Sequence, residues 1–85
     1  MREVLLVTDA KVIAPYRLWV AFSDGIEGEI DLRDELYGQV FEPLRDPAYF
    51  AQGVFDRRAG TVVWPNEADF APEFLHDLVE ATART

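Results

Sequence analysis

The chain has 85 residues, of which 49% are hydrophobic and 28% are charged, and it contains no cysteine. This composition predicts one small folded domain over residues 1–85 and excludes a disordered chain, a disulfide framework and thiolate chemistry. Sixteen acidic residues against eight basic ones give a net charge of −8, which disfavours direct binding to DNA or RNA because phosphate backbones are repelled.

Residues 4–22 predict two strands separated by a proline. Apolar residues occur on both faces of residues 4–14, which indicates a long or bulged strand buried on both sides near its start. Pro15 interrupts this strand because proline lacks the backbone donor that a central ladder needs. Residues 16–22 then alternate strictly, which places Leu18 on the core face and Trp19 on the opposite face.

The Asp24-Gly25 pair predicts a hairpin. Two alternating runs flank it, and glycine tolerates the positive φ of a two-residue type I′ turn. Residues 26–32 form the returning strand. Its core-facing residues are predicted to be Ile26, Ile30 and Leu32, and its outward residues Glu27, Glu29 and Asp31.

The remaining elements are short helices, two strands and a terminal helix. Asp46-Pro47 opens a helix of one to two turns that ends at Gly53. The other expected elements are a helical turn at 34–37, a short apolar piece at 40–44, strands at 54–57 and 61–64, and a helix at 72–82. This order, β-β-β-α-β-β-α, predicts an α+β fold of two layers, in which the helices cover an antiparallel sheet.

The sequence lacks a recognisable catalytic, cofactor-binding or metal-binding motif. His76 is the single histidine and is predicted to lie on the solvated side of the terminal helix. Asp69 and Glu73 have the spacing of a carboxylate pair, but their place at a helix start favours capping. We therefore expect no catalytic residue, no metal site, no cofactor and no enzymatic activity.

Candidate contact residues lie on the outward face of the hairpin. Trp19 is a typical interface anchor, and Glu27, Glu29 and Asp31 form a negative ribbon beside it. The ribbon either attracts a basic protein or protects an exposed sheet from aggregation. For Trp64, packing in the core and exposure at a rim both stay open.

Four blocks of sequence carry a resemblance to a known family. They are Phe22-Ser23-Asp24-Gly25, Ile30-Asp31-Leu32, residues 41–50, and Trp64-Pro65-Asn66 with Asp69 and Pro72-Glu73-Phe74-Leu75. The set resembles the prokaryotic domain-of-unknown-function family 2442, which has a Trp-Pro-Asn-Gly-x-Asp-x-x-Pro-Glu-x-Leu signature. Glu67 stands where that signature has glycine, and a positive φ there would strain the glutamate.

The resemblance implies a small α+β domain without established enzymatic residues. Some members are fused to a helix-turn-helix DNA-binding domain, and others are encoded beside a second small protein, as in toxin–antitoxin pairs. We expect a protein-interaction module, antitoxin-like in the second setting, with a basic partner and with a homodimer left open. The alternative is a regulatory domain that senses a small ligand.

The partner surface predicted from these observations combines the outward face with the signature turn. Its residues are Trp19, Glu27, Glu29, Asp31, Trp64, Asn66 and Asp69. No apolar run reaches the roughly 20 residues of a membrane span, and the first residues lack a signal-peptide pattern, so a cytoplasmic protein without membrane association is expected.

Overall fold

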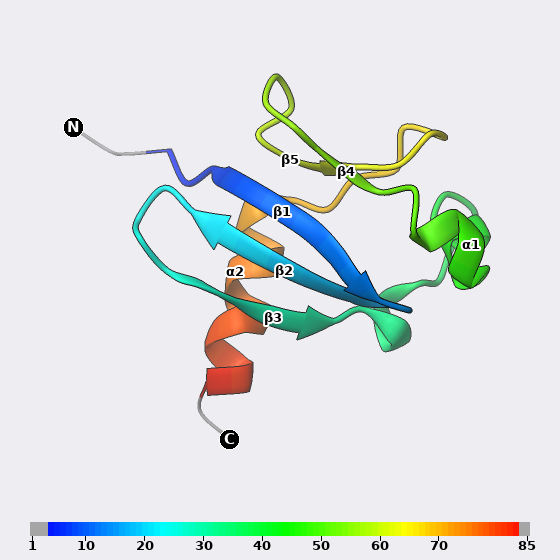
Figure 1. Cartoon of the computed structure of the whole chain (residues 1–85), viewed down its shortest axis with the longest axis horizontal. Coiled ribbons are helices and arrows are strands. Elements are labelled where there is room, and N and C mark those ends of the chain that lie inside the picture. The colour runs from blue at the N-terminus through cyan, green and yellow to red at the C-terminus, as the bar shows by residue number, and fades with distance from the viewer. Residues whose placement is uncertain (1–3, 84–85) are drawn as a thin grey trace.

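The computed structural model describes residues 4–83, and its elements confirm the α+β prediction (Figure 1). The elements are β1 (Val7–Ala14), β2 (Arg17–Phe22), β3 (Glu27–Asp31), η1 (Arg33–Glu35), η2 (Glu42–Arg45), α1 (Pro47–Phe50), β4 (Val54–Asp56), β5 (Thr61–Val63) and α2 (Pro72–Ala83). The strands divide into two antiparallel sheets, with the orders β1-β2-β3 and β4-β5.

Strand β2 is the centre of the larger sheet, and its alternation is as predicted. Leu18, Val20 and Phe22 are buried, while Trp19 on the other face is half-buried. The pairing of β1 with β2 is irregular at two places, which confirms a bulged first strand. Burial on both sides of its start is wrong, however, because Val4 and Leu6 are exposed.

Both turns of this sheet need a residue with positive φ. At the β1–β2 turn Tyr16 has φ +66°, directly after Pro15, a combination typical of a type II turn. The β2–β3 hairpin is confirmed, but its predicted two-residue type I′ turn is wrong. Phe22 N–H donates to Ile26 O, so three residues form the loop, and only Gly25 among them has positive φ. This is a type I turn followed by a bulge glycine.

Helix α2 covers the inward face of β2 and β3 (Figure 1). A Cβ atom on Gly28 would lie 2.9 Å from Val79 Cγ1, so glycine permits the close approach of the helix. Ile30 and Leu32 are buried beneath the helix and its neighbours, as predicted. Ile26 is 37% exposed, because it sits at the rim of the turn, and its predicted core position is wrong.

The smaller sheet lies beside β1, and Trp64 joins it to the short helices. Trp64 is only 2% exposed, and its indole N–H donates to Phe50 O at 2.8 Å. Helix α1 begins as predicted, with the Asp46 carboxylate accepting from Ala48 N–H at 3.0 Å and Pro47 in the first position. Both sheets and α2 therefore contribute to one hydrophobic core.

Candidate functional site

The outward face of the β1-β2-β3 sheet carries a row of three cross-strand neighbours. Trp19 pairs with Lys11 of β1 on one side and with Glu29 of β3 on the other. Directly opposed residues in an antiparallel sheet point to the same face, so the indole stands between an ammonium and a carboxylate. Because α2 packs against the opposite face, this row belongs to the open side of the sheet.

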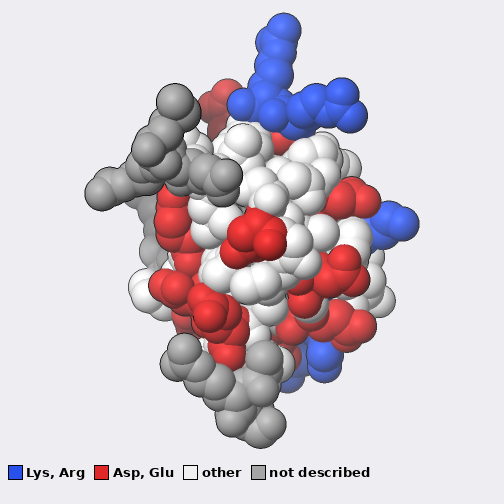
Figure 2. Space-filling model, turned by 90° about the vertical axis from the view of Figure 1, so that its left-hand side faces the viewer, with Lys and Arg blue, Asp and Glu red and all other residues white. Residues whose placement is uncertain are grey.

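Acidic side chains of β3 lie on one side of Trp19 on this open face, and Lys11 of β1 lies on the other. Glu27, Glu29 and Asp31 are all exposed, as predicted. Arg17 compensates part of the charge, with its Nη2 atom 3.4 Å from Glu29 Oε1, but both side chains are about half exposed and such a pair holds weakly. Figure 2 views the end of the molecule that carries the β2–β3 turn, where acidic side chains spread over the described surface and basic ones lie at its margins. We call Trp19, Glu27, Glu29 and Asp31 the open-face set.

The signature turn after β5, residues 64–69, is held in place by hydrogen bonds of the Asn66 side chain. Asn66 Oδ1 accepts from Ala68 N–H at 3.1 Å, while its Nδ2 donates to Val40 O at 2.9 Å. Trp64, at the start of the turn, is buried and is therefore not available to a partner, which removes it from the predicted contact surface. Glu67 has φ +69°, the conformation for which the family signature uses glycine.

Asp69 lines an apolar groove and does not cap helix α2. Helix α2 begins only at Pro72, and within residues 4–83 the Asp69 carboxylate makes no hydrogen bond to the first turn. The expected capping role is therefore wrong for Asp69, whereas Glu73 does lie in that first turn, where a negative charge is favourable. The groove encloses about 250 Å³ and is lined by Glu35, Tyr37, Phe41, Asp69, Phe70, Ala71 and Phe74.

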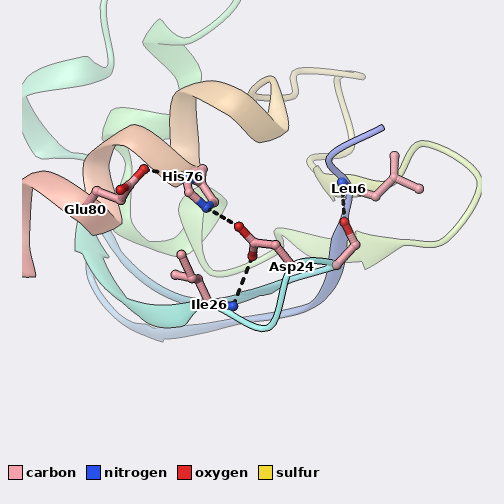
Figure 3. A network of polar contacts seen from close by, with 6 residues as sticks. Leu6, Asp24, Ile26, His76 and Glu80 are labelled. Atoms are coloured by element: carbon pink, nitrogen blue, oxygen red, sulfur yellow. Dashed lines mark hydrogen bonds and ion pairs between the residues drawn. The ribbon is translucent and has the colours of Figure 1, made fainter. Parts of the chain in front are cut away.

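His76 is the centre of a polar network, which the sequence did not predict (Figure 3). Its side chain is only 13% exposed, so the expectation of a solvated histidine is wrong. Nε2 lies 2.7 Å from Asp24 Oδ2 and Nδ1 lies 2.9 Å from Glu80 Oε1. The ring also packs edge-on against Phe22, with 4.9 Å between ring centroids. The network therefore fastens α2 to the β2–β3 turn.

The two acids make His76 more basic than usual. Burial by itself lowers the pKa of His76, but the hydrogen bonds and charges of Asp24 and Glu80 outweigh it and raise the pKa above 6.5. The pKa of Asp24 is lowered, first because Ile26 N–H donates to the carboxylate, and further by His76, while burial acts in the opposite direction. An imidazolium that donates from both nitrogens fits these distances.

His76 and Asp69 belong to different polar environments in the described part of the chain. The partners of His76 are Asp24 and Glu80, while Asp69 belongs to the groove. Ligand atoms of His76, Asp77 and Glu80 lie within 4.8 Å of one another and could contact a cation. A metal would first have to remove a proton from the histidine, since the imidazolium offers no lone pair. That the chain has no catalytic residue and no metal site remains a prediction.

Residues 7–80 match the family described as protein of unknown function (DUF2442). The chain belongs to the DUF2442 family. The family predicted from the four sequence blocks is thereby confirmed over residues 7–80.

A solved structure resembles this DUF2442 chain along its whole length. It is the crystal structure of the putative DNA-binding protein NE0471 from Nitrosomonas europaea ATCC 19718, with a TM-score of 0.78 and 28% sequence identity. The match covers 99% of this chain and 56% of that protein, so this chain spans little more than half of it. No curated protein matches the chain. Within residues 4–83, no helix combines the length and the apolarity needed to cross a bilayer.

Proposed function

We propose that this DUF2442 domain is a non-enzymatic protein-interaction module that binds a basic protein through its open-face set. The observation that carries the proposal is the position of Trp19. It occupies the middle strand of a sheet whose other face is covered by α2, and it is half-buried beside the exposed carboxylates of β3. Tryptophan is enriched at interface hot spots, and a polar rim usually encloses such an anchor.

The charge of the domain supports a basic partner. A net charge of −8 speeds the encounter with a positively charged protein and opposes contact with nucleic-acid phosphates. Asn66 and Asp69 are exposed at the signature turn and stay candidate contact residues, whereas buried Trp64 does not. In a gene pair of the toxin–antitoxin kind, this domain would be the acidic, antitoxin-like partner.

Co-expression with the product of the adjacent gene tests the proposal. We expect one complex on a sizing column at low salt that separates at high salt, because opposite charges contribute to the association. Trp19→Ala should weaken the complex by at least about tenfold, as expected for a central aromatic anchor. Val54→Ala, a matched exposed apolar position on β4, should leave it unchanged. Two independent monomers at low salt would contradict the proposal.

A second function is favoured by the solved relative. NE0471 is described as a putative DNA-binding protein and is longer than this chain, which suits a domain that regulates an attached DNA-binding part. In that setting the domain would sense a small ligand in the region of the signature turn. A thermal-shift screen separates the two functions, because a ligand present at about 100 times its dissociation constant adds about 2.7 kcal/mol to the free energy of unfolding.

A further inference from the structure

The apolar groove beside the signature turn has aromatic walls. Phe70 stacks between two other rings, with centroids 4.6 Å from Phe41 and 5.6 Å from Phe74 and interplanar angles of 17° and 14°. Phe41 and Phe74 are half-buried, and Tyr37 at the same groove is 68% exposed. The stacked rings form one rigid apolar wall of the groove, with Phe70 buried between the other two.

Two carboxylates without a partner stand among these rings. Glu35 and Asp69 both line the groove, and neither side chain makes a hydrogen bond or ion pair with another residue of the range 4–83. The acids come from separate elements, Glu35 from η1 and Asp69 from the segment before α2. The tertiary structure thus places two negative charges against one aromatic surface.

The chemistry of this arrangement selects a flat cation. Aromatic rings attract positive charge, and carboxylates accept hydrogen bonds from it. A guanidinium satisfies both demands, since it stacks on aromatic faces, is weakly hydrated and donates to carboxylates in a planar fork, whereas an ammonium is a strongly hydrated point charge.

We propose that the groove binds an arginine side chain of a partner protein. At about 250 Å³ it lies below the usual range of about 300 to 1,000 Å³ for small-molecule pockets, so it suits a single inserted side chain. The inference rests on the proposed function in one respect, that the partner is basic. The groove is separate from the open-face set, with which it shares no lining residue.

A titration of the whole chain with short blocked peptides tests the groove without the partner. We expect acetyl-Gly-Arg-Gly-amide to shift the NMR signals of Phe41 and Phe74 saturably at millimolar concentration. The lysine peptide should bind more weakly, and the norleucine peptide should not bind. Equal binding of the norleucine peptide, or no saturable shift with the arginine peptide, would overturn the inference.

Matched variants locate the interaction. Glu35→Gln and Asp69→Asn should each lower the affinity by about two- to fivefold, as exposed charge pairs do. Asp9→Asn removes the same charge at an exposed position of β1, outside both the groove and the open-face set, and should have no effect. Tyr37→Ala, at an exposed position that folding does not require, should also weaken binding. Arginine binding that is unchanged in the Glu35→Gln, Asp69→Asn and Tyr37→Ala variants would overturn the inference.

The outcome is distinguishable from a failure of the proposed function. Suppose that the partner complex forms and depends on Trp19, while the Glu35→Gln, Asp69→Asn and Tyr37→Ala variants bind both the arginine peptide and the partner as the unchanged chain does. Only the groove assignment then fails. If the groove binds arginine peptides and no partner complex forms, the proposed function fails and the groove stands.

Discussion

The imidazole of His76 and the carboxylate of Asp24, 52 residues apart in sequence, meet at 2.7 Å between Nε2 and Oδ2. This contact ties the middle of α2 to the β2–β3 turn, while Glu80 holds the other ring nitrogen at 2.9 Å (Figure 3). Asp24 also accepts from Ile26 N–H at 3.0 Å within the turn. One carboxylate therefore shapes the hairpin and anchors the helix that covers the inward face of its sheet.

The network predicts a pH-dependent stability. The raised pKa of His76 means that its contribution is complete below the ordinary value of 6.5 and is lost as pH rises through the folded-state pKa. The lowered pKa of Asp24 means that its contribution is present above 3.8 and is lost as pH falls through its folded-state value. The groups that face His76 are Asp24 from the turn and Asp77 and Glu80 from α2. The network is therefore strongest between about pH 4 and 6.5.

Urea unfolding at pH 5.5 and pH 9 measures this dependence. We expect the free energy of unfolding to be smaller at pH 9 than at pH 5.5, because the raised pKa of His76 means that its contribution is lost as the imidazolium deprotonates. Asp24→Asn keeps an acceptor for Ile26 N–H but removes the charge, so its loss of stability over the same interval should be smaller. If the free energy of unfolding falls as much between pH 5.5 and pH 9 in Asp24→Asn as in the unchanged chain, the pH dependence arises elsewhere.

Glu67→Gly is expected to stabilise the fold. The glutamate has φ +69° and is exposed, so its replacement relieves the strained backbone and removes no side-chain contact. Relief of a left-handed residue is worth about 1 to 2 kcal/mol, and the greater freedom of glycine in the unfolded chain offsets about 0.4 to 1 kcal/mol of it, which leaves a net gain centred on about 0.8 kcal/mol. The midpoint of urea unfolding reports the gain. Glu67→Ala retains a Cβ atom and should show none of it; equal midpoints for the two variants would contradict the explanation.

Gly53→Ala is expected to destabilise the fold because it collides with the buried tryptophan. A Cβ atom at this position would lie 2.6 Å from Trp64 Cε2, and the indole cannot move freely while its N–H donates to Phe50 O. We expect a loss of about 1 to 3 kcal/mol, the usual cost of overpacking. Gln52→Ala, one residue earlier and exposed, is the control and should unfold near the unchanged midpoint. A Gly53→Ala variant as stable as this control would contradict the packing described here.

The local signals of the sequence predicted most of the fold. Strict alternation placed Leu18 and Val20 in the core, and the pair Asp24-Gly25 marked the hairpin. The turn type was missed because loop length depends on the register of the strands, and here Phe22 bonds to Ile26. Such a register is settled by packing along both strands and not by the two turn residues alone.

The candidate sites depend on contacts that no local pattern contains. A helical projection places His76 among charged residues, yet the β2–β3 turn covers that side of α2 and buries it. The groove likewise joins Glu35 to Asp69 from distant segments. Trp64 could not be placed because its burial depends on packing against Phe50 and Phe70, which come from separate segments, with Phe50 O also accepting from the indole N–H. The open-face set was predictable since strand alternation alone defines it.

The affinity of the domain for the product of its neighbouring gene, measured calorimetrically at two salt concentrations, tests the central claim most directly. We predict binding that weakens as salt rises from about 50 to 500 mM, over which charges become screened, and that weakens at least about tenfold further in Trp19→Ala but not in Val54→Ala. Binding that is insensitive to salt and equal in both variants would contradict a charged docking face centred on Trp19.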